Sequence, residues 1–116
     1  MSDDEATFMQ VRRRIKEFNK ARNWDKYHTP KDLAVSISIE AAELLENFQW
    51  EEAKGPKEIK RDRRKMGRIE DEVADLMIYL LVLCDRLDID ASDAIANKIA
   101  RNEVRFPAGD ELSFRK

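Results

Sequence analysis

Apolar residues recur three and four positions apart along most of the chain, which is the spacing of one face of an α-helix. Only three glycines and three prolines interrupt the 116 residues. The pattern therefore predicts an all-α protein without strands, in which four helices form one bundle-like domain. A chain of this length supports a single core, expected over about residues 5–107, with a flexible tail over residues 108–116.

Capping residues and helix breakers predict where the first two helices begin and end. The first helix is expected over residues 4–21, with an apolar packing stripe. Thr29 has the character of an N-cap residue, and Pro30 follows it at the first helical position, so the second helix is expected to begin there. Gly55 and Pro56 are expected to end this helix or to follow its end closely.

The second half of the chain is predicted to contain one long helix and one shorter helix. The charged stretch 57–66 is expected to be a separate short helix or a mobile segment, with Gly67 as a possible joint before the long helix that ends near Leu87. Asp90 or Ser92 is then expected to cap a fourth helix.

The long helix carries more apolar surface than one small bundle can cover. Its main stripe consists of Ile69, Val73, Leu76, Leu80, Leu83 and Leu87. Four further apolar residues widen this surface, namely Met77, Ile78, Leu81 and Val82. We therefore expect a subunit interface on this helix.

Composition excludes several classes of protein. Charged residues make up 40% of the chain but the net charge is only −2, so bulk attraction to nucleic acid is not expected. The single cysteine, Cys84, cannot form an intrachain disulfide and is expected to be a buried, inert thiol in a reducing cytosol. The apolar run 76–84 is too short to span a bilayer and no signal peptide is evident, so a soluble cytoplasmic protein is expected.

Four carboxylates in two identical spacings are the strongest candidates for chemistry. They are Glu40 and Glu43 in IEAAEL, and Glu72 and Asp75 in DEVADL. Each pair projects from one helix face. One such pair is ordinarily a solvated face, but two pairs that border strong apolar stripes repel each other and are costly unless a cation binds them. The all-oxygen ligand set favours Mg²⁺, with Mn²⁺ as a substitute, and Mg²⁺ is usually shared with substrate phosphates.

Three further groups of residues allow either an ordinary or a functional interpretation. Lys98, Asn102 and Arg105 lie together on the fourth helix, as surface residues or as the countercharge for a polyphosphate. The basic run 61–65 is a solvated helix face or a contact for phosphate. The aromatic group is formed by Trp24, Tyr27, His28, Trp50 and Tyr79. These side chains are core or surface residues, or they stack on and hydrogen-bond a nucleobase.

The EAAE and EVAD motifs, followed downstream by KIARNEVRFP, resemble the MazG-like all-α nucleoside triphosphate pyrophosphohydrolases, whose signature is ExxE followed by ExxD. Within that superfamily, FNKARNWDKYHTPKDLAVSISIEAAELLENFQW resembles the dCTP pyrophosphatase branch. The resemblance covers about residues 18–107. The charged segment 51–68 departs from that branch.

This resemblance implies a role for each candidate residue. Mg²⁺ would be bound by Glu40, Glu43, Glu72 and Asp75. The triphosphate would be held by Lys98, Asn102 and Arg105, and the base and sugar by Trp24, His28, Trp50 and Tyr79. Glu43 is our candidate for the general base. The family also implies a homodimer, or a tetramer built from dimers.

The implied activity is Mg²⁺-dependent hydrolysis of a nucleoside triphosphate to a monophosphate and pyrophosphate. The implied substrates are dCTP or modified pyrimidine deoxynucleotides, removed as housecleaning. A dUTP or dUDP hydrolase of the same architecture is the competing enzyme. A non-catalytic helical module that binds nucleotide, metal or a partner protein is the alternative from another class.

Overall fold

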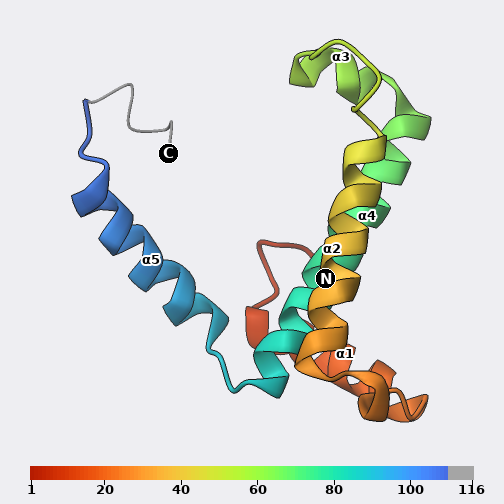
Figure 1. Ribbon diagram of the computed structural model, residues 1–116, viewed down its shortest axis with the longest axis vertical. Coiled ribbons are helices and arrows are strands. Elements are labelled where there is room, and N and C mark those ends of the chain that lie inside the picture. The colour runs from red at the N-terminus through yellow and green to blue at the C-terminus, as the bar shows by residue number, and fades with distance from the viewer. Residues whose placement is uncertain (110–116) are drawn as a thin grey trace.

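The computed structural model describes residues 1–109, and every regular element in them is a helix, which confirms the all-α prediction. The elements are α1 (Phe8–Ala21), the 3₁₀ turn η1 (Asp25–Tyr27), α2 (Pro30–Glu46), α3 (Pro56–Arg61), α4 (Arg63–Arg86) and α5 (Ala91–Arg105) (Figure 1). Most of the expected flexible tail, residues 110–116, lies outside the described residues.

The first helix begins later than predicted because a capping box fixes its start. The backbone nitrogen of Gln10 donates to the Thr7 hydroxyl at 3.2 Å, and the Gln10 side chain accepts from the backbone nitrogen of Thr7 at 2.8 Å. Residues 4–7 therefore precede the helix. The predicted start of α2 is confirmed, since the Thr29 hydroxyl accepts from the backbone nitrogen of Asp32 at 3.1 Å and Pro30 is the first helical residue.

Helix α2 ends well before Gly55, so Gly55 and Pro56 do not mark its end. Its C-cap is Asn47, whose side-chain amide donates to the backbone oxygens of Glu43 and Leu44 at 3.4 and 3.3 Å. These bonds add a side-chain donor to the carbonyls of the last turn and so help to close the end of α2. Gly55 and Pro56 instead begin the separate short helix α3.

The break before the long helix lies at Asp62 and not at Gly67, which is an internal residue of α4. The Asp62 carboxylate accepts from the backbone nitrogen of Lys65 at 3.0 Å and caps α4. Asp90 caps α5 in the same way, accepting from the backbone nitrogen of Asp93 at 2.9 Å. Of the two predicted caps, Asp90 is therefore the one used.

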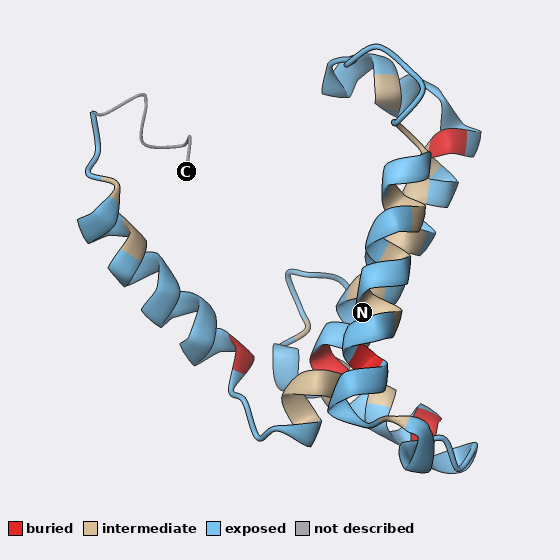
Figure 2. Cartoon of the chain, viewed as in Figure 1, coloured by how far each residue is buried: buried red, intermediate tan, exposed pale blue. Residues whose placement is uncertain are grey.

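Helices α2 and α4 run antiparallel and side by side, and α1 packs across the second half of α4 (Figure 1). The buried apolar residues are few and lie near this crossing and at the start of α5 (Figure 2): Leu33, Leu81, Val82 and Ala91. Leu81 and Val82, two of the residues that widen the apolar surface of α4, are buried within the chain, where α1 packs on α4. Val73 and Leu80 of the expected stripe are instead 41% and 44% exposed.

Helix α5 runs away from the α2–α4 pair, so a single chain does not complete a four-helix bundle (Figure 1). Ile95 and Ile99, two large apolar residues of α5, are 50% and 53% exposed. Cys84 is half-buried and not fully buried as expected. None of the described helices is long and apolar enough to cross a membrane.

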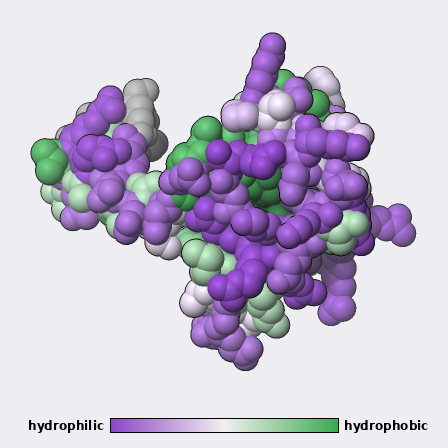
Figure 3. Space-filling model, turned by 90° about the horizontal axis from the view of Figure 1, so that it is seen from below, coloured by the Kyte–Doolittle hydropathy of each residue, from purple (hydrophilic) through white to green (hydrophobic). Residues whose placement is uncertain are grey.

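The chain is more extended than a compact monomer of its mass. It exposes 9658 Å² of surface, whereas a compact chain of 13.6 kDa exposes roughly 6,600 Å². Its radius of gyration is 17.0 Å, against about 13 Å for a globular domain of this length. Apolar side chains remain open on α2, α4 and α5, and Figure 3 shows hydrophobic groups in the middle of one face, bordered by hydrophilic ones.

Candidate metal and nucleotide site

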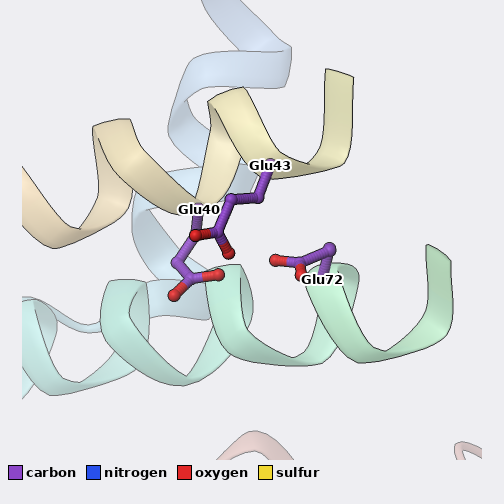
Figure 4. A group of neighbouring side chains, drawn as sticks. All are labelled: Glu40, Glu43 and Glu72. Atoms are coloured by element: carbon purple, nitrogen blue, oxygen red, sulfur yellow. The ribbon is translucent and has the colours of Figure 1, made fainter. Parts of the chain in front are cut away.

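Three of the four predicted carboxylates converge between the two long helices. Glu40 and Glu43 project from successive turns of α2 toward Glu72 on α4 (Figure 4). One carboxylate oxygen from each residue lies within 4.8 Å of the other two. The spacing of three residues on α2 and the antiparallel packing of α4 bring these groups together.

The electrostatics of this cluster are those of carboxylates that share a small space. The pKa of Glu40 is raised from 4.5 to about 7, first by a side-chain hydrogen bond with Glu72 and then by burial. The nearby Glu43 and the charge of Asp75 raise it further. The Oε2 atoms of Glu40 and Glu72 are buried and have no hydrogen-bond partner among the described residues. Close, unpartnered carboxylate oxygens are suitable ligands for a hard divalent cation.

Asp75 lies at the border between this cluster and a neighbouring cavity. It is one turn beyond Glu72 on α4 and is exposed. Its charge acts on Glu40, and its side chain lines the cavity. Asp75 therefore connects the carboxylate cluster to the space beside it.

The cavity has a volume of about 520 Å³ and lies between α1, α4 and the loop that joins α1 to α2. Three of the predicted base-binding residues line it, namely Trp24, His28 and Tyr79. The Nδ1 atom of His28 is buried and has no hydrogen-bond partner among the described residues. The volume is within the range of small-molecule sites, and the lining combines aromatic rings with a few polar atoms.

Two cavity residues, Phe18 and Asn19, were not predicted as site residues. The rings of Phe18 and Trp24 meet edge to face with centroids 5.6 Å apart. Asn19 is only 5% exposed, and its backbone oxygen accepts from the backbone nitrogen of Trp24 at 3.0 Å. A signal for Asn19 is present in the sequence, because it follows Ile15 by four residues on an otherwise apolar helix face.

A second cavity of about 360 Å³ adjoins the cluster on its other side. It is lined by Glu43, Glu72 and several other polar residues, including Arg68. The Nε of Arg68 donates to the side-chain oxygen of Asn47 at 3.2 Å, which links α4 to the end of α2. Arg68 was not singled out from the sequence, although it precedes Glu72 by one helical turn.

The chain does not bring every predicted residue to the cluster. Trp50 is 88% exposed in the segment after α2, at the end of that helix remote from the loop with Trp24 (Figure 1). Lys98, Asn102 and Arg105 are carried by α5, which leads away from the α2–α4 pair. The Oδ1 of Asn102 is buried without a hydrogen-bond partner in the described part of the chain.

Fold and site together define an all-α protein with a carboxylate cluster beside an aromatic cavity. The profile of the MazG-like family matches residues 35–116, and the chain belongs to this family, as its motifs predict.

Relatives with named activities are found at moderate identity. The chain is 33% identical to dCTP pyrophosphatase 1 of Homo sapiens over 104 residues, which are 90% of this chain and 61% of that protein. It is 32% identical to dCTP pyrophosphatase 1 of Bos taurus over 103 residues, or 89% of this chain and 61% of that protein. The chain thus spans about three fifths of the length of these relatives.

A solved structure matches over nearly the whole of both chains. It is a pyrophosphatase from Archaeoglobus fulgidus, with 43% sequence identity and a TM-score of 0.78, and the match covers 92% of this chain and 98% of that chain. The predicted resemblance is therefore confirmed at the level of family and fold.

Proposed function

We propose that the protein is a Mg²⁺-dependent nucleoside triphosphate pyrophosphohydrolase. It converts a nucleoside or deoxynucleoside triphosphate and water to the monophosphate and pyrophosphate. The observation that carries the proposal is the convergence of Glu40, Glu43 and Glu72, with two buried and unpartnered oxygens, beside a cavity of about 520 Å³. The names of the relatives add support.

The preferred substrates are dCTP or modified pyrimidine deoxynucleotides, and the role is housecleaning of the cytoplasmic nucleotide pool. This preference is supported by the dCTP pyrophosphatases among the relatives. It is also consistent with a cavity in which Trp24, His28 and Tyr79 surround a space large enough for a small base.

Glu40, Glu43, Glu72 and Asp75 would hold Mg²⁺, with Mn²⁺ as a substitute. When bound, this cation polarises phosphate oxygens and lowers the pKa of a coordinated water. Glu43 accepts the proton of the attacking water as the general base. Its half-buried position next to the other acids suits this role.

The base and the phosphates are bound by separate parts of the chain. Trp24 stacks on the base, and Tyr79 and His28 provide polar atoms, including the buried Nδ1. Lys98, Asn102 and Arg105 bind the triphosphate. The positive charges of Lys98 and Arg105 neutralise the departing pyrophosphate.

We propose further that the protein acts as a homodimer, or as a tetramer built from dimers, in which α5 of a second copy completes the site. Three features support this assembly: α5 leaves the body of its own chain, Ile95 and Ile99 are about half exposed, and the surface area exceeds that of a compact monomer. The 88% exposure of Trp50 is consistent with a contact to another chain. Light scattering after size-exclusion chromatography measures the assembly, and a monomer would refute it.

The activity is tested with a panel of ribo- and deoxyribonucleoside triphosphates and dUDP, with and without Mg²⁺. Pyrophosphate, orthophosphate and monophosphates are separated by ion-exchange chromatography. We expect metal-dependent release of pyrophosphate from a pyrimidine deoxynucleotide, and no release by the Glu72→Gln variant. Monophosphate and orthophosphate from dUDP would instead identify a diphosphate hydrolase. Absence of both turnover and metal binding would favour the non-catalytic module.

A further inference from the structure

Arg86, in the last turn of α4, binds the loop that carries two of the cavity side chains. Its Nε donates to the backbone oxygen of His28 at 3.0 Å, and its Nη2 donates to the backbone oxygen of Asp25 at 2.5 Å. A guanidinium is planar and rigid, so it fixes two acceptors relative to each other. Arg86 itself is not part of the cavity wall that the described residues form.

The loop is attached at its other side to α1. Asn23 has a φ of 58°, a left-handed conformation that turns the chain back toward the helix. The backbone nitrogen of Trp24 then donates to the backbone oxygen of Asn19 at 3.0 Å. The loop is thus fixed to α1 beside Trp24 and to α4 beside His28.

The cavity wall and this anchor lie on the same side of α4. Tyr79 and Val82 line the cavity, and Arg86 follows Tyr79 by two helical turns and Val82 by one. One helix therefore supplies part of the cavity wall and holds the loop that supplies another part of it. The exposure of most loop residues, including Trp24 at 42%, means that little other burial restrains the loop.

We propose that Arg86 is a positioning residue for base recognition. By holding the carbonyls of Asp25 and His28, it keeps Trp24 and His28 facing Tyr79 and so sets nucleotide affinity without contacting the nucleotide. The inference rests on the proposed function, because it assigns Arg86 a role in that cavity. It extends that function by naming a residue that controls binding of the base and leaves metal binding unchanged.

Two substitutions separate positioning from simple stabilisation. Arg86 is a cation in the last turn of α4, where a positive charge also favours the helix. Arg86→Lys keeps this charge but loses the planar fork that binds two carbonyls. Arg86→Gln removes both. Arg13→Gln is the matched control, since Arg13 is an exposed arginine on α1 outside the loop.

The order of the loop is measured without any need for turnover. The chain has two tryptophans, so Trp50→Phe leaves Trp24 as the sole tryptophan, which is excited selectively at wavelengths that tyrosine does not absorb. In this background and without nucleotide, we expect both Arg86 variants to increase quenching of Trp24 by acrylamide. The Arg13 control should match its parent.

Kinetics and metal binding are measured in the background that retains Trp50. We expect KM for the best nucleotide to rise roughly tenfold in both Arg86 variants while kcat stays within about twofold. Calorimetric titration with Mn²⁺ should give the same affinity as the wild-type protein. The control should keep wild-type values in both assays.

Several results would overturn the proposal. The proposal fails if the folded Arg86→Lys variant shows the same quenching of Trp24 and the same KM as the wild-type protein. This comparison tests the proposal even if Arg86→Gln does not fold. Another such result is a fall in kcat or in Mn²⁺ affinity with unchanged KM, which would place the action of Arg86 at the carboxylate cluster. If the wild-type protein hydrolyses no nucleotide, the proposed function fails, and Trp24 quenching still decides whether Arg86 orders the loop.

Discussion

Glu40 on α2 faces Glu72 on α4, and the neighbouring Glu72 side chain is the largest cause that raises the pKa of Glu40 to about 7. The buried Oε2 atoms of both residues have no hydrogen-bond partner in the described chain. A proton on Glu40, or a bound cation, therefore relieves the repulsion between these carboxylates.

The stability of the metal-free protein should depend on pH through Glu40. Its pKa is about 7 in the folded protein against an ordinary value of 4.5, so the folded state binds the extra proton between these values. This contribution is present at about pH 5 and is lost as the pH rises through 7. We expect Glu40→Gln to raise Tm relative to wild type in EDTA at about pH 8, with a smaller difference at about pH 5.

Thermal unfolding followed by circular dichroism measures this effect. Glu70→Gln, an exposed substitution on the same helix as Glu72, serves as the control and should show no such pH-dependent difference. Mg²⁺ should raise the Tm of the wild-type protein at about pH 8 much more than that of Glu40→Gln. An equal difference in Tm at every pH would contradict the raised pKa of Glu40.

Glu43→Gln should lower turnover by on the order of 10² or more while the fold is kept. The amide cannot accept a proton from water, and it is a weaker metal ligand. Measured Mn²⁺ affinity distinguishes the two causes, since loss of a general base alone leaves the affinity close to wild type. Glu70→Gln is again the control, and near-normal turnover by Glu43→Gln would refute the assigned role.

Features that depend on neighbouring residues in the chain were predictable from the sequence. The cap at Thr29 and the facing of Glu40 and Glu43 follow from spacings of three residues. The start of α1 was also readable, since Gln10 follows Thr7 at the capping-box spacing and the apolar stripe begins at Phe8, although the helix was predicted to start at residue 4.

Features that depend on distant contacts were not predictable in the same way. Periodicity defined an apolar stripe on α4 but not which helix covers it, so Val73 is exposed and Leu81 is buried. The direction of α5, and with it the distance of Lys98 from the cluster, is set by the turn near Asp88, where φ is 54°. Arg86 could not be assigned to the loop because its acceptors are backbone oxygens.

Lys65 and Glu51 should stabilise the segment between α2 and α4 as a pair. The Lys65 side chain is 5% exposed, its Nζ bonds to the Glu51 carboxylate, and it lies 5.3 Å from the centre of the Phe48 ring. The bond from Lys65 lowers the pKa of Glu51, so the stabilisation is present at neutral pH and lost on acidification.

We expect Glu51→Gln to lower Tm more than the double variant Glu51→Gln/Lys65→Met, because the single change leaves a buried ammonium without its carboxylate. Glu52→Gln, the neighbouring exposed acid, is the control. Thermal unfolding at neutral pH measures all of these variants. A double variant no more stable than Glu51→Gln would show that the ammonium has another partner.

Mixing two inactive variants tests whether α5 acts on the site of a second copy. Glu72→Gln should inactivate through the carboxylate cluster, and Lys98→Met through the phosphate contact on α5. If each site combines the cluster of one chain with α5 of the other, a mixed dimer contains one site with both defects and one intact site. Dissociating and reassembling equal amounts should then restore about a quarter of wild-type turnover, since half of the dimers are mixed and each has one working site.

Each variant taken alone through the same treatment is the control. No recovery in a mixture shown by mass spectrometry to contain mixed dimers would place both residues in a site formed by one chain.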